Sequence, residues 1–374
     1  MVHSTHTDFS ARLLTWFYQH GRHDLPWQQL HRPTPDPYPV WVSEIMLQQT
    51  QVATVIGYFE RFMARFPTLE ALASADTDEV LTHWAGLGYY ARARNLHKAA
   101  QSLKAIKDST GAYPKTAEDW QALSGIGRST AGAIVSMGLG GFGVICDGNV
   151  KRVLARQFAI ADDLKKSSTE KTLWSLATAL TPKDQSGHYA QAMMDLGATL
   201  CTKSRPACTL CPVSDSCQAF QAGIPTAYPI KTPKTPKPTH HSTALYLIHK
   251  EKALWLKRPD DGIWGGLYCL PFLSDSLPDS FDEQLIKDTL ETLIRSQPCD
   301  ALPSIRHTLT HFHWQLSIMP ITLDDKTAAT LDVMLSHANC QFGWYNKKDA
   351  TALARPTAMK KLLEAASTAS MTVF

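Results

Sequence analysis

A glycine-containing hairpin followed by an acidic residue is the first candidate for chemistry in this sequence. Residues 123–127 (L-S-G-I-G) predict a turn between two short helices, where Gly125 and Gly127 permit positive φ and let backbone N–H groups converge. Such N–H groups, at the positive end of the next helix, can hold a phosphate. Twenty residues after Gly127 comes Asp147, followed by Asn149 and another helix-like stretch. By residue type Asp147 predicts a helix N-cap, and its interval from the hairpin strengthens the phosphate-site hypothesis.

A second acidic residue, Glu44, lies in a stretch that predicts one helix or two, residues 41–66. Within one helix Glu44, Gln48 and Gln51 would share a face, because they fall at i, i+4 and i+7. A lone glutamate in a helix is usually solvated, but the neighbours of Glu44 are mostly apolar. A carboxyl group at the edge of an apolar setting can have a raised pKa, which suits a general acid.

Four cysteines form the third candidate, with the spacing C-x6-C-x2-C-x5-C at Cys201, Cys208, Cys211 and Cys217. Thiolates this close in sequence can enclose one metal centre. Zinc sites usually pair two short C-x2–4-C motifs, and this spacing contains one such motif. The pattern therefore favours a 4Fe–4S cluster, with either a structural or a redox role.

Up to residue 200, the sequence predicts that the candidate residues are positioned by helices. Thr116 predicts the start of the helix before the hairpin, and residues 167–170 (S-S-T-E) predict a capping box for a helix over 171–180. Residues 86–94 (G-L-G-Y-Y-A-R-A-R) break the pattern. Tyr89 could wedge between bases and Arg92 could bind phosphate, or the segment is a helix junction capped by aromatic residues.

The second half of the chain has a different composition. Residues 225–243 are rich in proline and lysine and predict an extended linker between a helical domain, 1–224, and a second domain, 244–374. Beyond the linker the pattern predicts a small α+β domain. Its expected strands are 244–249, 253–257 and others within 305–323, and its expected helices are 280–295 and 356–366.

Composition limits the classes of function. The formal charge of +3 and the pI near 8.3 mean that a nucleic-acid partner would need a local basic surface. The sequence shows neither an apolar run of membrane-spanning length nor a signal peptide at its start, so we expect a cytoplasmic protein, near the nucleoid if it is bacterial. Eight cysteines in a reducing setting argue against a disulfide framework.

Together these features resemble the helix-hairpin-helix DNA glycosylases related to endonuclease III. Residues 41–52 (W-V-S-E-I-M-L-Q-Q-T-Q-V), 86–92 and 147–152 (D-G-N-V-K-R) narrow the resemblance to the MutY-type adenine DNA glycosylases. The resemblance implies an enzyme that removes adenine mispaired with 8-oxoguanine, and with guanine, from double-stranded DNA. It also implies an all-α glycosylase core, one 4Fe–4S cluster on the four cysteines, and a monomer.

By the same resemblance Glu44 protonates adenine at N7, Asp147 stabilises the positive sugar, and Asn149 assists. This fits the chemistry, because adenine is a poor leaving group and its loss leaves an oxocarbenium-like sugar. The residues expected to contact DNA are Gly125, Gly127, Gln48, Gln49, Thr50, Tyr89, Arg92 and Lys151.

The C-terminal domain resembles a Nudix domain through residues 262–267 (G-I-W-G-G-L), but residues 271–303 lack the glutamate-rich helix that Nudix hydrolases need. We therefore expect a recognition domain. Leu309-Thr310-His311 stands where the family has a Phe-Ser-His loop that inspects 8-oxoguanine, so Thr310 and His311 are the candidates for lesion recognition.

Two alternatives stay open from the residues. An endonuclease III-like lyase on oxidised pyrimidines would need a lysine nucleophile where this chain has Ser129, and serine forms no Schiff base. A non-catalytic DNA-binding or redox-sensing iron–sulfur protein would need neither Glu44 nor Asp147.

Overall fold

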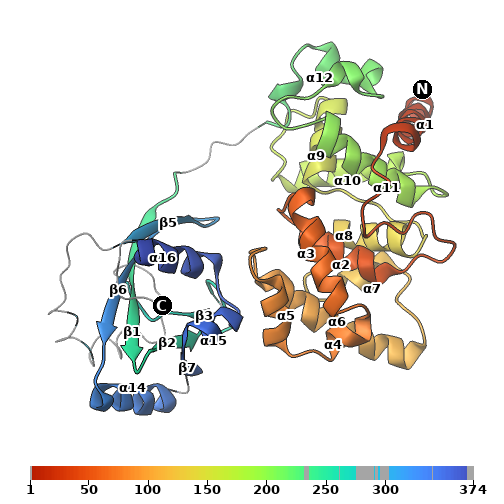
Figure 1. Cartoon of the computed structure of the whole chain (residues 1–374). Helices are drawn as coiled ribbons and strands as arrows, with labels where there is room; N and C mark the ends of the chain where they lie inside the picture. Colours follow the sequence, from red (N-terminus) through yellow and green to blue (C-terminus); the bar gives the residue numbers. More distant parts are fainter. Residues whose placement is uncertain are drawn as a thin grey trace. The chain divides into compact units, whose positions relative to one another are not determined.

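The computed structural model describes residues 2–230, 236–260, 262–274, 290, 294, 303–338 and 340–368 (Figure 1). The chain divides into two compact units. Unit 1 comprises Met1–Ser74 and Asn95–Lys234, and unit 2 comprises Ala75–Arg94 and Thr235–Phe374. Among the described helices, none combines the length and hydropathy that crossing a bilayer requires.

Unit 1 is helical throughout its described part, as the sequence predicts. Its main helices are α1 (Val2–His20), α2 (Pro37–Leu47), α3 (Val52–Arg65), α4 (Leu69–Ala73), α6 (Ala91–Thr110, which begins in unit 2), α7 (Ala117–Gln121), α8 (Arg128–Ala133), α9 (Gly148–Gln157), α10 (Ser167–Leu180) and α11 (Ser186–Asp195). Two π-helical turns, η1 (Ile134–Gly138) and η2 (Leu196–Leu200), extend α8 and α11. The prediction that Thr116 starts α7 is confirmed, because its side chain accepts from the Asp119 N–H.

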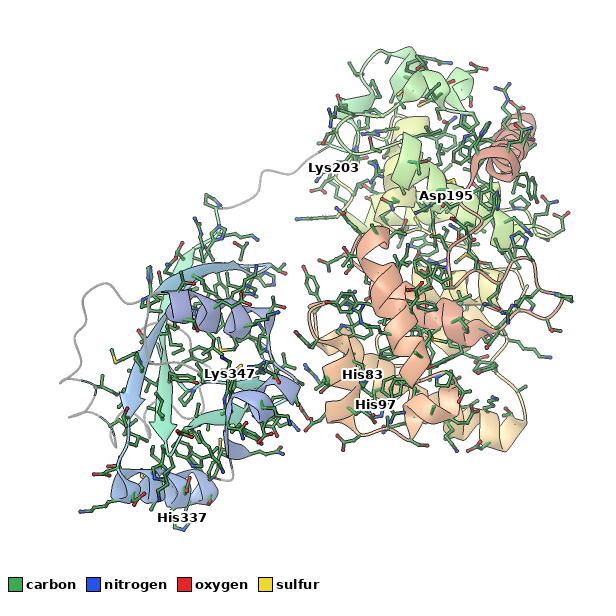
Figure 2. All side chains as sticks on the ribbon, in the orientation of Figure 1. His83, His97, Asp195, Lys203, His337 and Lys347 are labelled. Atoms are coloured by element: carbon green, nitrogen blue, oxygen red, sulfur yellow. The ribbon has the colours of Figure 1, made fainter. Side chains whose placement is uncertain are left out.

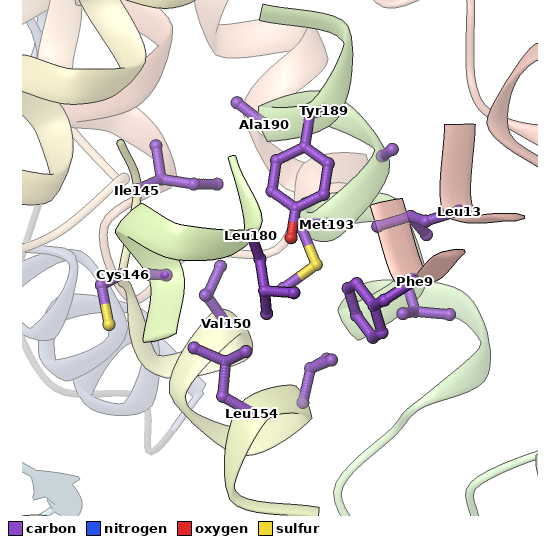
Figure 3. Packing of buried hydrophobic residues seen from close by; sticks show 14 of the residues in the cluster. Phe9, Leu13, Ile145, Cys146, Val150, Leu154, Leu180, Tyr189, Ala190 and Met193 are labelled. Atoms are coloured by element: carbon purple, nitrogen blue, oxygen red, sulfur yellow. The ribbon is translucent and has the colours of Figure 1, made fainter. Parts of the chain in front are cut away.

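One hydrophobic core of unit 1 holds the helix that follows Asp147. Figure 3 shows Phe9 and Leu13 of α1 in the same cluster as Val150 and Leu154 of α9. These apolar side chains recur at helical spacing, and their burial is the main source of stability for such a face. The first turn of α9, and with it the residues around its N-cap, is therefore fixed against a packed interior.

Two local predictions in unit 1 are wrong. Glu44, Gln48 and Gln51 do not share one helix face, because α2 ends at Leu47 and Gln49 adopts φ +60, which no α-helix continues. Gln51 is instead the N-cap of α3.

The capping box at residues 167–170 is also absent. Helix α10 already begins at Ser167, and its N-cap Lys166 makes no side-chain capping bond. The Glu170 carboxylate accepts from Lys151 Nζ on α9 instead, at 2.8 Å. The Glu170 side chain, which the local pattern assigns to a capping box, therefore forms an ion pair with another helix instead.

The cysteine-containing segment of unit 1 is a run of short turns. It comprises η3 (Cys208–Leu210), η4 (Ser214–Ser216), α12 (Gln218–Gln221) and η5 (Pro225–Ala227). Backbone bonds inside these turns, such as Cys211 N–H to Cys208 O at 3.2 Å, fold the segment back on itself.

Unit 2 contains a mixed sheet with helices, which confirms the α+β prediction. Its helices are α5 (Thr77–Trp84), α14 (Asp325–His337), α15 (Lys347–Ala352) and α16 (Thr357–Thr368). Its strands are β1 (Thr239–His249), β2 (Lys252–Lys257), β3 (Tyr268–Cys269), β4 (Phe272–Ser274), β5 (Ser304–Thr308), β6 (His313–Thr322) and β7 (Phe342–Tyr345). The order is β3-β2-β1-β6-β5, with β4 on β1 and β7 on β2. Of these pairs β1–β6 is parallel and the others are antiparallel.

The strand expected to begin at residue 244 begins earlier, at Thr239. The extra residues pair with β6, from Thr239 opposite His313 onward, and their polar sequence gives no local sign of this pairing. The helix expected at 280–295 lies outside the described residues apart from positions 290 and 294, whereas the helix expected at 356–366 is α16.

Candidate functional site

Asp147 is the N-cap of α9, as its residue type predicts. Its Oδ1 accepts from the Val150 N–H at 2.8 Å. Burial raises the pKa of Asp147, while backbone N–H groups of Val150 and Asn149 and the positive charges of Arg152 and Lys151 act in the opposite direction. The carboxylate is therefore partly desolvated, yet it is surrounded by groups that favour its ionised form.

Glu44 lies near the end of α2, with buried neighbours on both sides in sequence. Burial raises the pKa of Glu44 to about 8, and the negative charge of Asp147 adds to the shift. Two consequences follow. Glu44 holds its proton at neutral pH, and its carboxyl group lies within electrostatic reach of Asp147.

This arrangement brings a carboxyl group with a strongly raised pKa, that of Glu44, within electrostatic reach of the Asp147 carboxyl group in unit 1. Two carboxyl groups whose environments differ are how proteins separate a proton donor from an anionic stabiliser. The pair can protonate a leaving group and stabilise the cation that remains, which is the chemistry of glycosidic bond cleavage.

Asn149, the predicted assistant of Asp147, lies on the first turn of α9. Its backbone N–H favours the ionised form of Asp147, and its side-chain oxygen accepts from Arg152 Nη2 at 3.0 Å. Arg152 also donates to the carbonyls of Gly197 and Cys201, at 2.6 and 2.9 Å. The Asp147 turn is thus connected to the chain that enters the cysteine segment.

Of the two hairpin glycines, Gly125 has the positive φ that the sequence predicts, whereas Gly127 has φ −83, in the extended region. Gly125 has φ +76, and a Cβ atom there would lie 2.7 Å from the Cβ of Asn95. Gly127 is the N-cap of α8, and a Cβ atom there would meet nothing within 4 Å. The start of α8 therefore presents backbone N–H groups on an open surface.

Two cationic side chains of the hairpin region have partners in unit 1. Lys151 Nζ bonds Glu170, and the Arg128 guanidinium lies 3.9 Å from the centre of the Trp174 ring. A phosphate that bound Lys151 would therefore compete with Glu170.

The predicted DNA contacts after α2 form a tight turn. The Thr50 N–H donates to Leu47 O at 3.2 Å, and Thr50 Oγ1 approaches Gln48 O at 3.4 Å. Gln49 is exposed at the tip of this turn with its positive φ.

In unit 2 the loop after α5 presents Tyr89, which is 48% exposed with φ +51. Arg92 is buried, and its Nη2 donates to Gly88 O at 3.2 Å. Its guanidinium lies over the rings of Trp84 and Tyr89. Arg92 therefore shapes the loop, and its contact with phosphate stays a prediction.

Thr310 and His311 are exposed at the tip of the β5–β6 hairpin in unit 2. The hairpin closes with the Leu309 N–H donating to Phe312 O at 2.9 Å, and Lys237 Nζ donates to Leu309 O at 2.7 Å. The two side chains are thus presented on a supported turn.

The four cysteine side chains are free thiols in neighbouring turns. Burial raises the pKa values of Cys208, Cys211 and Cys217, and the negative charge of Cys201 contributes to each shift. Among the described residues, no three side chains of His, Cys, Asp or Glu are gathered closely enough to hold a metal ion. The donor chemistry of the set, four thiols that influence one another, still fits a thiolate-bound centre.

Arg156 is the main residue that the sequence analysis missed. It is 2% exposed, and it donates to the Sγ of Cys201 at 3.3 Å and to the carbonyls of Thr202, Lys203 and Tyr228 at 2.7, 3.0 and 3.0 Å. Figure 2 labels Lys203 in this loop. The spacing of Arg152 and Arg156, at i and i+4 on one helix, was the available signal.

Known proteins share these features. Residues 42–179 match the HhH-GPD superfamily of base excision DNA repair proteins, and residues 243–365 match the NUDIX domain. The chain is 37% identical to the adenine DNA glycosylase of Buchnera aphidicola (subspecies Acyrthosiphon pisum), over 95% of this chain and 97% of that protein. It is 33% identical to the human adenine DNA glycosylase, over 95% of this chain and 73% of that protein.

A solved structure agrees with the fold of unit 1. The structure of a thermostable thymine-DNA glycosylase is similar with a TM-score of 0.51 and 26% identity, over 59% of this chain and 98% of that one. The identities over nearly the whole chain show that this protein belongs to the adenine DNA glycosylases, the base excision repair enzymes of the HhH-GPD superfamily.

Proposed function

We propose that this enzyme removes adenine paired with 8-oxoguanine or with guanine in double-stranded DNA, by hydrolysing the N-glycosidic bond. The observation that carries the proposal is the relation of Glu44 to Asp147. Glu44 is half-buried, and desolvation together with the negative charge of Asp147 raises its pKa to about 8.

In the proposed reaction Glu44 donates its proton to N7 of adenine, which turns the base into a better leaving group. The bond to the sugar then breaks, adenine leaves with both electrons of the bond, and the Asp147 carboxylate stabilises the oxocarbenium-like sugar. A water molecule then adds to C1′ of this cation and loses a proton to solvent, which gives the abasic site. Asn149 supports the same turn. The adenine must first leave the base stack, because its reactive edge is inaccessible inside the duplex.

The same site would leave the DNA backbone intact. A lyase step needs an amine that forms a Schiff base with the opened sugar, and Ser129 offers a hydroxyl at the position where related lyases carry lysine. The proposed enzyme therefore releases free adenine and leaves an abasic site.

The DNA would be held on open backbone and polar groups. Backbone N–H groups at Gly125 and Gly127 would bind one phosphate, with Lys151 beside them once it leaves Glu170. The remaining candidate contacts are Gln48, Gln49, Thr50, Tyr89 and Arg92. We also propose a monomer that works in the cytoplasm, near the nucleoid if the source is bacterial.

We also propose that Cys201, Cys208, Cys211 and Cys217 hold one 4Fe–4S cluster. When bound, the cluster would cross-link the short turns through four sulfur–iron bonds. Arg156 would steady the first of these ligands through its bond to Cys201 Sγ.

Lesion recognition would fall to Thr310 and His311. 8-Oxoguanine differs from guanine at the C8 oxygen and the protonated N7, so telling them apart requires polar groups placed at that edge. The exposed tip of the β5–β6 hairpin offers a hydroxyl and an imidazole for this purpose.

A strand-cleavage assay tests the proposal. A labelled duplex with one adenine opposite 8-oxoguanine is incubated with the enzyme and then divided, with half treated with alkali. We expect cleavage at the adenine position in the alkali-treated half only, and release of free adenine. Duplexes with guanine opposite adenine, with a normal A:T pair, and with an oxidised pyrimidine serve as comparisons. Cleavage only of the oxidised pyrimidine, or cleavage without alkali, would contradict the proposal.

A further inference from the structure

The chain that leads into Asp147 lies directly against helix α8. A Cβ atom on Gly132 would overlap the carbonyl oxygen of Val144, and one on Gly143 would overlap the carbonyl oxygen of Gly132. Backbone therefore packs on backbone here, with glycine required on both sides. The segment from Gly143 to Asp147 takes its path from α8.

Ser129 makes the last contact along this path. Its Oγ accepts a hydrogen bond from the Cys146 N–H at 2.9 Å. Cys146 is 3% exposed, and it precedes α9 in a segment with no regular secondary structure, so neither water nor a helix supplies an acceptor there (Figure 3 shows its side chain beside Ile145 in the core). A buried N–H that loses its acceptor is costly, so this bond fixes the peptide plane.

The carboxylate of Asp147 is consequently held from two directions. On the helix side its Oδ1 accepts from Val150, and on the chain side the preceding residue is tied to Ser129. The bond from Val150 is the one that any N-capped helix makes. The bond to Ser129 comes from α8, the helix whose start is the proposed phosphate site.

We propose that Ser129 is a positioning residue for catalysis, whose hydroxyl orients Asp147 toward the sugar by holding the Cys146 amide. The inference rests on the proposed function for its role in catalysis. It gives the serine a task of its own at the position where related lyases carry a nucleophile. It also connects the hairpin to the chemistry, since the first turn of one short helix carries both the proposed phosphate site and the serine that orients the carboxylate.

Three variants test the proposal. Ser129→Ala removes the acceptor and Ser129→Thr keeps it. Ser136→Ala is the matched control, because this buried hydroxyl of the same helical run donates to Ala133 within the run. Single-turnover adenine excision is measured alongside the equilibrium Kd for the same duplex. We expect Ser129→Ala to lose about tenfold in excision rate with Kd unchanged within about twofold, and Ser129→Thr and Ser136→Ala to stay near the wild-type rate.

Two measurements without DNA separate positioning from a general loss of structure. Hydrogen exchange of the Cys146 amide should become faster in Ser129→Ala only. Carboxyl NMR of Asp147 should show its raised pKa falling toward the ordinary value in that variant, because a freer carboxylate gains water.

The outcomes distinguish this proposal from the proposed function. Wild-type protein that removes no adenine contradicts the function, while the exchange and NMR measurements still test the positioning. If the wild type is active and Ser129→Ala excises adenine at the same rate, the catalytic role of Ser129 is overturned. If Ser129→Thr is as slow as Ser129→Ala, or if the Cys146 amide exchanges unchanged, the hydrogen bond is not the cause.

Discussion

Glu44 lies close enough to Asp147 for the charge of one carboxyl group to raise the pKa of the other. The two residues come from helices separated by about a hundred positions in sequence, α2 and the N-cap of α9. The packing of the helices of unit 1 brings the two carboxyl groups near each other. In the proposed mechanism this pair would supply a proton donor and an anion at the same pH.

The raised pKa of Glu44 should make the stability of the fold depend on pH in a definite direction. Its pKa is about 8 in the folded chain against an ordinary 4.5, so between these values the folded state keeps a proton that the unfolded state has lost. Stability therefore falls as pH rises through this window and levels off above about 8. Glu44→Gln removes this dependence. The Tm of the variant relative to that of the wild type should therefore increase from pH 5 to pH 8.

Thermal unfolding over that pH range measures the effect. Glu70→Gln is a useful control, because the ion pair with Lys107 lowers the pKa of Glu70 below its ordinary value. Glu70 is therefore ionised in both the folded and the unfolded state from pH 5 to pH 8, and the Tm difference between Glu70→Gln and wild type should stay constant over this range. A Tm difference between Glu44→Gln and wild type that is the same at pH 5 and pH 8 would mean that Glu44 is not desolvated.

Removing the charge of Glu170 should tighten DNA binding. Lys151 is paired with Glu170 in the free protein, and a phosphate must displace that carboxylate. We expect Glu170→Gln to lower Kd about two- to fivefold and to make log K fall more steeply with log salt, since one more cation is available to phosphate.

A DNA-binding titration at several salt concentrations checks this expectation. Glu70→Gln carries the same charge change at another Lys–Glu pair of unit 1, with a similar 2.9 Å bond to Lys107. Equal tightening by both variants would indicate a net-charge effect, and no tightening by Glu170→Gln would place Lys151 away from the DNA.

Replacing Arg156 should weaken binding of the proposed 4Fe–4S cluster. The guanidinium holds Cys201 Sγ and three backbone carbonyls of the cysteine segment, and a methionine of similar length offers no donor. We expect Arg156→Met to be purified with less than half of the wild-type iron and with weaker cluster absorbance.

Arg12→Met is its control, because Arg12 binds the same segment only at its surface, through Asp215. Iron content and absorbance at visible wavelengths are compared in anaerobically purified proteins. Stoichiometric zinc without iron in the wild type would overturn the cluster assignment, and full iron in Arg156→Met would remove Arg156 from it.

Changing the tip of the β5–β6 hairpin should reduce the preference for 8-oxoguanine over guanine opposite adenine more than it reduces adenine excision itself. Thr310→Ala and His311→Ala remove side chains proposed to contact 8-oxoguanine, so adenine opposite 8-oxoguanine should lose about tenfold in kcat/KM while adenine opposite guanine changes little. Thr330→Ala and His337→Ala, exposed on α14 of the same unit, are the controls. If all four variants keep the wild-type ratio between the two duplexes, lesion recognition lies elsewhere.

The parts of the fold that depend on neighbouring residues could be predicted from sequence. Thr116 and Asp147 cap the helices that their types indicate, and the strands around residues 305–323 appear as expected. These features arise from local hydrogen bonds and from alternating or helical apolar patterns.

The sequence-based predictions fail where a residue distant in sequence determines the local structure. Glu170 binds Lys151 instead of capping its own helix, and the polar start of β1 pairs with β6. The spacing of Arg152 and Arg156 puts both on one face of α9, but the acceptors of Arg156 belong to residues 45 to 72 positions later in the chain. Likewise the resemblance gave Glu44 a role, but only the packed structure supplies the burial that keeps its proton.

Single-turnover excision by Glu44→Gln and Asp147→Asn tests the central claim most directly. An amide at position 44 keeps the shape and cannot donate the acidic proton, and an amide at position 147 still caps α9 but carries no charge. Each variant should bind the duplex with adenine opposite 8-oxoguanine about as tightly as the wild type, while excising adenine at least about a hundredfold more slowly. Excision near the wild-type rate by either variant would contradict the assignment of a proton donor at Glu44 and a stabilising carboxylate at Asp147.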